Sequence, residues 1–94
     1  MKADFSNLFI AFNNKPVGRI SDLRVSEIET DEHGPFRWIE LTSPDMVQTH
    51  CGSNVLIVEK GTTRVVHSFF VHALRIDPNE KFTLIRGKQH KRIT

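Results

Sequence analysis

The stretch "VVHSFFVHALRID", Val65 to Asp77, is the longest apolar segment of the chain and has the composition of a single β-strand. Successive side chains of a strand point to opposite faces, so odd and even positions form two separate rows. The odd row contains Val65, Phe69 and Val71, and the even row contains Phe70, Leu74 and Ile76. Because both rows are apolar, the pattern predicts a strand with no face left to solvent.

Turn signals divide the rest of the chain into short β-like segments. Asn, Gly and Pro residues bound apolar runs that are typical of strands. The segment 17–29 changes phase along its length, which indicates a bulge near Gly18 to Asp22 or a strand that crosses between two sheets. The six predicted strands are 7–12, 17–29, 36–43, 54–60, 65–77 and 82–87.

The segment "SPDMVQTHCG" interrupts this β pattern and favours a short helix. Ser43 is a suitable N-cap, and Pro44 suits the first helical position. Asp45 complements the helix dipole, and Gly52 can end the helix in a left-handed conformation. We expect about two turns of helix here, with one side against the core.

These elements predict an all-β fold with one short helix, arranged as a six-stranded antiparallel sandwich or partly closed barrel. The length of 94 residues suits one core. We expect a single β domain over residues 1–87 and a basic C-terminal tail over residues 88–94. In the even row of the long strand, we expect Phe70 and Leu74 to be buried.

The composition is that of a soluble globular protein, with 38% hydrophobic and 26% charged residues. No run approaches the roughly 18 apolar residues of a membrane span, so we expect no membrane insertion. Asp4 interrupts the N-terminus before a signal-peptide core could form. The single cysteine, Cys51, excludes an internal disulfide and fits a reducing, cytoplasmic compartment.

The side chains that carry most enzyme chemistry are present without the spacing that such chemistry needs. His67 and His72 are five positions apart on a strand, so they face opposite sides and cannot share a metal ion. His50 and Cys51 are adjacent and lack a second ligand pair. The acidic residues near 27–32 flank a predicted turn, where solvated carboxylates are the rule. We therefore expect no catalytic residue, no metal site and no cofactor.

Charge is distributed unevenly along the chain. Residues 81–94 carry five basic residues and no acidic one, whereas the preceding residues carry eight basic and eleven acidic ones. Arg86, Lys88, Lys91 and Arg92 are therefore candidate contacts to phosphate groups or to a partner. A small β-barrel module that binds nucleic acid or regulates a partner through this basic C-terminus is one hypothesis for the function.

Residues 34–76 show a second pattern, in which a Pro-Phe strand is followed by an Asp-containing loop, a glycine and two further strands. The residues that carry it are Pro35, Phe36, Glu40, Leu41, Ser43, Asp45, Gly52, Gly61 and His67. In this order they resemble the tail-tube-like β-barrel domains of phage tail tubes, baseplate hubs and type VI spike proteins. Those hub and spike proteins, and typical tube subunits, are longer than this chain.

The resemblance implies a ring-forming structural subunit of a phage tail or related injection assembly, located in the virion after assembly in the host cytoplasm. Its partners would be further copies or other virion proteins. The two apolar rows of the long strand fit this hypothesis, since one row could lie between subunits with backbone edges paired as added strands. Val65, Phe69 and Val71 are then the expected interface residues. A phage-encoded inhibitor of a host protein is a third hypothesis.

Overall fold

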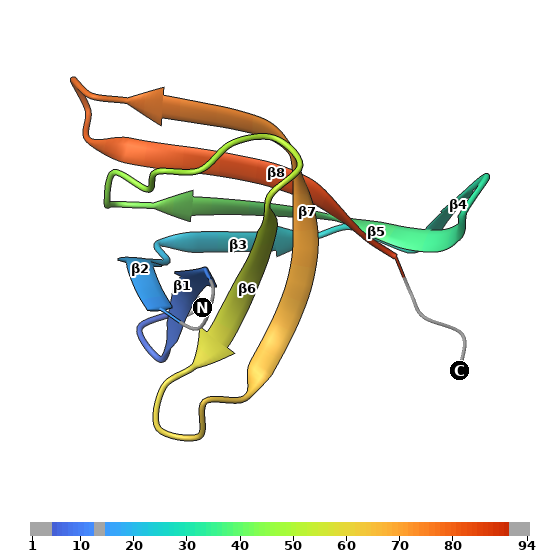
Figure 1. Ribbon diagram of the computed structural model, residues 1–94, viewed down its shortest axis with the longest axis horizontal. Helices are drawn as coiled ribbons and strands as arrows, with labels where there is room; N and C mark the ends of the chain where they lie inside the picture. Colours follow the sequence, from blue (N-terminus) through green and yellow to red (C-terminus); the bar gives the residue numbers. More distant parts are fainter. Residues whose placement is uncertain (1–4, 13–14, 91–94) are drawn as a thin grey trace.

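The protein folds into one antiparallel sheet of eight strands, and its computed structural model describes residues 5–12 and 15–90 (Figure 1). The strands are β1 (Leu8–Phe12), β2 (Lys15–Arg19), β3 (Asp22–Val25), β4 (Glu29–Asp31), β5 (Gly34–Ser43), β6 (Asn54–Glu59), β7 (Val65–Asp77) and β8 (Phe82–His90). Their order across the sheet is β2-β1-β6-β7-β8-β5-β3, and β4 also pairs with β5. The all-β prediction is confirmed.

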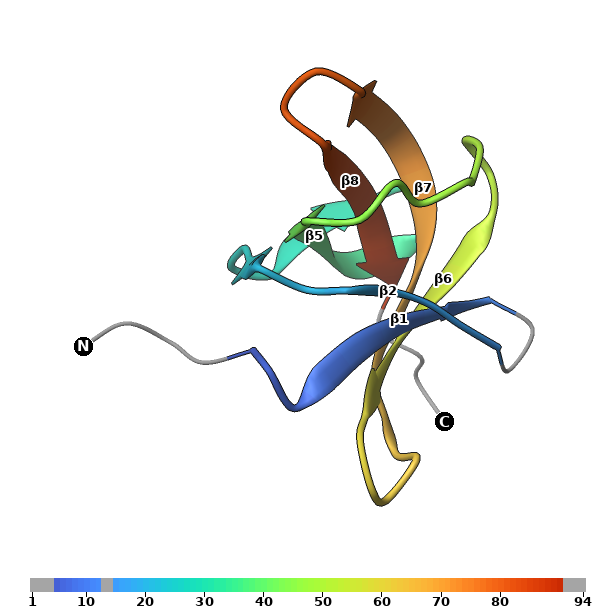
Figure 2. The ribbon, with the colours of Figure 1, turned by 90° about the vertical axis from the view of Figure 1, so that its left-hand side faces the viewer.

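The sheet curls strongly but does not close into a barrel. β1 and β2 lie on one side, β5 and β8 lie on the other, and β6 and β7 run between them (Figure 2). The edge strands β2 and β3 follow each other in the chain, joined only by Ile20 and Ser21. The segment 17–29, predicted as one strand, therefore divides into β2, β3 and β4, which raises the number of strands from six to eight.

The concave side of the sheet is filled by a continuous apolar core. Phe69 from β7 is its largest fully buried side chain, and isoleucines from four other strands surround it. The buried cluster comprises Ile10, Ile20, Ile39, Leu41, Val47, Val55, Ile57, Phe69, Val71 and Ile85. Because the interior is packed with side chains, folding of this domain rests on hydrophobic burial.

β7 contains two bulges that change which side chains face the core. Val66 is the extra residue between the pairs formed by Val65 and His67, and His72 is the extra residue between Val71 and Ala73. A one-residue bulge exchanges the faces of all later side chains. The inward row therefore passes from odd positions before His72 to even positions after it.

Four predictions about β7 are decided by these bulges. Phe69 and Val71 are only 1% and 2% exposed, so the prediction that they form a subunit interface is wrong. Phe70 is 57% exposed, so its predicted burial is also wrong. Leu74 lies beyond the second bulge and packs, partly buried, against the core. Val65 is 49% exposed and remains a surface residue.

The segment 44–53 is not helical, contrary to the prediction. Ser43 is the last residue of β5, and its Oγ accepts a hydrogen bond from the Asp45 N–H in a turn. The Val47 N–H donates to Thr83 Oγ1, and the Gly52 N–H donates to the Val71 carbonyl. These tertiary hydrogen bonds use the backbone groups that a helix would need, and Val47 enters the core.

β8 extends to His90, so the predicted boundary between domain and tail at residues 87 and 88 falls within a strand. Phe36 of β5 pairs with His90, and Trp38 pairs with Lys88. Lys88 is therefore part of the sheet. Lys91 and Arg92, the other tail residues of the prediction, lie outside the described residues.

Candidate interaction surfaces

β1 and β6 are apolar on both faces, which is unusual for a sheet with one solvated side. Ile10 and Ile57 are register partners that point into the core. On the opposite face, Phe9 pairs with Val58 and Ala11 pairs with Leu56. The two-sided apolar character that the sequence shows in β7 is thus present in the folded protein at β1 and β6.

The outer side chains of these strands line a groove of about 320 Å³. We call it the outer groove; its residues are Phe9, Ala11, Leu56, Val58, Thr63 and Val65. Val65 joins it as the register partner of Val58 and is 49% exposed. Phe9 and Leu56 are half-buried, Ala11 and Val58 are buried at its floor, and Thr63 and Val65 form its exposed part. Apolar surface of this kind marks interaction sites in soluble proteins.

Four basic residues lie on the elements next to the strands of the outer groove. Arg19 is the register partner of Phe9, and Lys15 is at the other end of β2. Lys60 and Arg64 belong to the turn between β6 and β7. All four are exposed.

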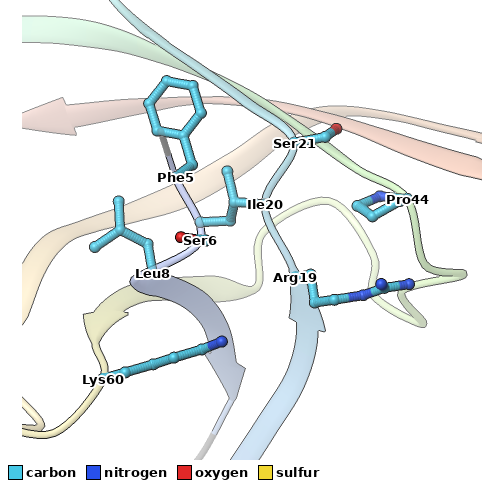
Figure 3. Close-up of a pocket in the computed structure, with 8 residues that line it drawn as sticks. All are labelled: Phe5, Ser6, Leu8, Arg19, Ile20, Ser21, Pro44 and Lys60. Atoms are coloured by element: carbon cyan, nitrogen blue, oxygen red, sulfur yellow. The ribbon is translucent and has the colours of Figure 1, made fainter. Parts of the chain in front are cut away.

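Arg19 and Lys60 line a second cavity, of about 340 Å³ (Figure 3). It lies where the chain before β1 meets the connection between β2 and β3. Its other lining residues are Phe5, Ser6, Leu8, Ile20, Ser21 and Pro44. None of the residues that line this cavity is acidic.

Arg19 is held by Asp45 from the segment that follows β5. Its guanidinium donates to both carboxylate oxygens, at 2.7 and 3.1 Å, and its backbone N–H donates to Oδ2 at 2.8 Å. The side-chain hydrogen bond from Arg19 lowers the pKa of Asp45 below its usual value, and the backbone hydrogen bond adds to this effect. Asp45 thus occupies a backbone donor of β2, a strand at the edge of the sheet.

A second feature projects from the sheet on the other side of the molecule (Figure 1). We call residues 25–36 the arm; they comprise the end of β3, β4 and the start of β5. Val25 and Ile28 are 40% and 49% exposed. The arm carries four acidic residues and no lysine or arginine, and three of them, Glu27, Glu29 and Glu32, are fully on the surface.

The base of the arm is an aromatic and cationic cluster on β5 and β8. The Arg86 guanidinium carbon lies 3.9 Å from the centroid of the Trp38 ring. Lys88 Nζ lies 4.4 Å from the centroid of Phe36 and 5.2 Å from that of Trp38. Cations above aromatic faces are attracted by the ring quadrupole. These contacts hold the basic side chains against the sheet.

Asp31 of the arm accepts hydrogen bonds from this cluster. Lys88 Nζ and His90 Nε2 each lie 3.1 Å from its Oδ2, and the His33 N–H donates to its Oδ1. Burial raises the pKa of Asp31, but the hydrogen bonds from His33, His90 and Lys88 outweigh it and lower the pKa to about 2. Asp31 therefore joins β4 to the end of β8.

The predicted phosphate contacts are only partly free. Lys88, predicted as a contact to phosphate or to a partner, forms an ion pair with Asp31 of its own chain. Its side chain is only 21% exposed. Arg86 is exposed but lies over Trp38. A phosphate at Lys88 would have to compete with a carboxylate already in place.

The described residues bring no group of three His, Cys, Asp or Glu side chains together in a way that could hold a metal ion. His50 Nδ1 lies 3.1 Å from the Cys51 carbonyl oxygen, and the Cys51 thiol lies 3.4 Å from that of His72. Among the same residues, no helix is long and apolar enough to cross a membrane.

Family models, curated proteins and solved structures gave no match to this chain. The features of the molecule that bear on function are the outer groove, the arm and the cluster at the base of the arm. Sequence reasoning did not select Phe9, Leu56 or Ile28. The signal for the first two was present, since "NLFIAF" and "NVLIV" are apolar at odd and even positions alike.

Proposed function

We propose that this protein is a structural subunit that assembles with further copies of itself. The observation that carries the proposal is the outer groove, an apolar surface on the solvent side of β1 and β6. A small monomer has no use for a second apolar face, since exposing it costs free energy and risks aggregation. Contact with another subunit removes this cost.

The assembly contact uses side-chain faces and not a strand added at β2, because that edge of the sheet is obstructed. On β2, Pro16 has no N–H to donate, and the Arg19 N–H is already bonded to Asp45. An edge occupied in this way disfavours strand addition.

The resemblance to tail-tube-like domains supports a more specific proposal. A ring component of a phage tail or related injection assembly needs a subunit with extensive contacts and no catalytic site. Virion proteins or further copies would then be the partners, and the virion the location. The apolar outer face supports this proposal independently of the resemblance, because it follows from the strand pattern of β1 and β6.

Sedimentation velocity of the purified chain tests the proposal. We expect species larger than a monomer, and the fraction of the protein in these species should increase as its concentration is raised from micromolar to millimolar. A well-folded protein that remains monomeric over this whole range would overturn it. A gel-shift assay with a single-stranded oligonucleotide at low salt tests the nucleic-acid hypothesis in parallel, and we expect no shift because Lys88 is paired with Asp31.

A further inference from the structure

We propose that the arm of one copy docks into the outer groove of the next, so that the subunits join head to tail. This inference rests on the proposed self-assembly and specifies which two surfaces meet. Ile28 and Val25 supply the apolar side of the contact on the arm, and Phe9, Leu56 and Val65 receive them in the groove.

The exposed apolar side chains of the molecule include one on the arm and one in the outer groove. Ile28 and Val65 are each 49% exposed, as high a value as any large apolar side chain in the described part of the chain except Phe70. They lie on different features, the arm and the outer groove, which are on different sides of the molecule (Figure 1). An apolar knob and an apolar groove that cannot meet within one chain can meet between two.

Charge complementarity also favours this contact. The arm carries Glu27, Glu29 and Glu32 on its surface, and the exposed residues Lys15, Arg19, Lys60 and Arg64 lie on β2 and on the turn between β6 and β7, next to the strands of the groove. Two of the four basic residues are already paired, Arg19 with Asp45 and Arg64 with Glu59. Lys15 and Lys60 form no ion pair among the described residues. They are therefore available to the acidic residues of an incoming arm.

The geometry of such a contact determines the kind of assembly. The arm and the groove are different surfaces, so each subunit keeps one of each unused after the first contact. A contact of this heterologous type makes a closed ring when its rotation closes and a filament when it does not. A symmetric dimer, in which both copies use the same patch, is not expected.

Two variants that each disable one side of the contact provide the test. Ile28→Asp disables the arm, and Val65→Asp disables the groove; both sites are exposed, so folding should be retained. We expect each variant alone to associate at least tenfold more weakly than the unmodified chain in sedimentation velocity. Met46→Asp is the matched control, since Met46 is 41% exposed but belongs to neither surface, and it should assemble normally.

Mixing the two variants gives the decisive measurement. Ile28→Asp retains a working groove and Val65→Asp retains a working arm, so an equimolar mixture should form one-to-one dimers and nothing larger. Circular dichroism and Trp38 fluorescence of each variant verify that it is folded. Normal assembly of either variant alone, or a mixture that stays monomeric, would overturn the head-to-tail contact.

Charge reversal is a second measurement that does not depend on apolar substitutions. Glu29→Lys and Lys60→Glu should each weaken association, and their equimolar mixture should recover part of it at low salt. No effect of either reversal would contradict the charge argument. These outcomes are distinct from failure of the proposed function, in which the unmodified chain itself never assembles.

Discussion

Replacing Phe69 and Phe70 separately by alanine tests the bulged geometry of β7 directly. The two residues are adjacent and identical, so differences in strand propensity cancel between the variants. Phe69 is 1% exposed and lies in the core, whereas Phe70 is 57% exposed. Regular alternation along the strand allows either residue to face inward, and only the pairing around Val66 and His72 selects Phe69.

The expected losses of unfolding free energy differ severalfold. Phe69→Ala removes a fully buried ring and should cost about 3–5 kcal/mol. Complete burial of a phenylalanine side chain contributes about 1.5–3 kcal/mol, and Phe70 is 43% buried, so Phe70→Ala should cost about 1 kcal/mol. Urea unfolding at low protein concentration, followed by the fluorescence of the only tryptophan, measures both.

Equal losses for the two variants, or a larger loss for Phe70→Ala, would refute the assignment of faces in β7. If Phe69→Ala does not fold, Phe69→Leu provides the comparison. It keeps most of the apolar volume and should still cost more than Phe70→Leu. The urea dependence should be unchanged in both, because neither substitution alters the surface exposed on unfolding by much.

Three further substitutions test other parts of the fold. Gly87→Ala should destabilise by about 2–3 kcal/mol in urea unfolding, because an added Cβ would overlap the Phe70 carbonyl oxygen; a gain in stability would contradict this close approach. Asp31→Asn should lower the melting temperature at neutral pH. This difference in melting temperature from the unmodified chain should vanish between about pH 4 and pH 2, because Asp31, whose pKa is about 2, becomes protonated there. A difference that persists below pH 2 would argue against the ionised carboxylate as its cause. Asp45→Ala should cost about 1 kcal/mol because the Arg19 N–H loses its partner, and unchanged stability would show that water replaces the carboxylate.

The strand content of this protein could be predicted from its sequence because turn residues bound nearly every apolar run. The faces of the longest strand could not. A bulge inserts one residue without a consistent sequence signal, and neither Val66 nor His72 differs from a regular strand residue. Once the two bulges are known, the apolar rows of β7 combine into a single inward face, with Phe69 and Val71 before His72 and Leu74 after it.

The prediction of a helix within residues 43–52 failed because capping signals are local and the competing contacts are not. Ser43 and Pro44 suit the start of a helix, but they suit the observed turn equally well, since Ser43 Oγ accepts a hydrogen bond from the Asp45 N–H there. The group that decides the outcome is Thr83, whose Oγ1 accepts from the Val47 N–H and donates to the Asp45 carbonyl across the fold. A residue 36 positions away is invisible to a local pattern.

The same limit applies to the candidate surfaces. The apolar outer faces of β1 and β6 could be predicted, since both segments are apolar at odd and even positions alike. The pairing of Lys88 with Asp31 could not, because 57 residues separate the two. A basic C-terminal segment therefore predicted exposed cations, whereas the fold places one of them between a carboxylate and two aromatic rings.

The outer groove and the obstructed edge of β2 suit a subunit better than a monomer. A monomer gains from an obstructed edge, because strand addition is disfavoured there, but it loses from an apolar face left in water. For a subunit, the apolar face provides the contact, and the obstructed edge at Arg19 disfavours the alternative contact by strand addition at β2. Specific assembly requires both an attractive surface and the suppression of competing ones. The fold therefore directs association to side-chain surfaces, where position and charge can define one neighbour.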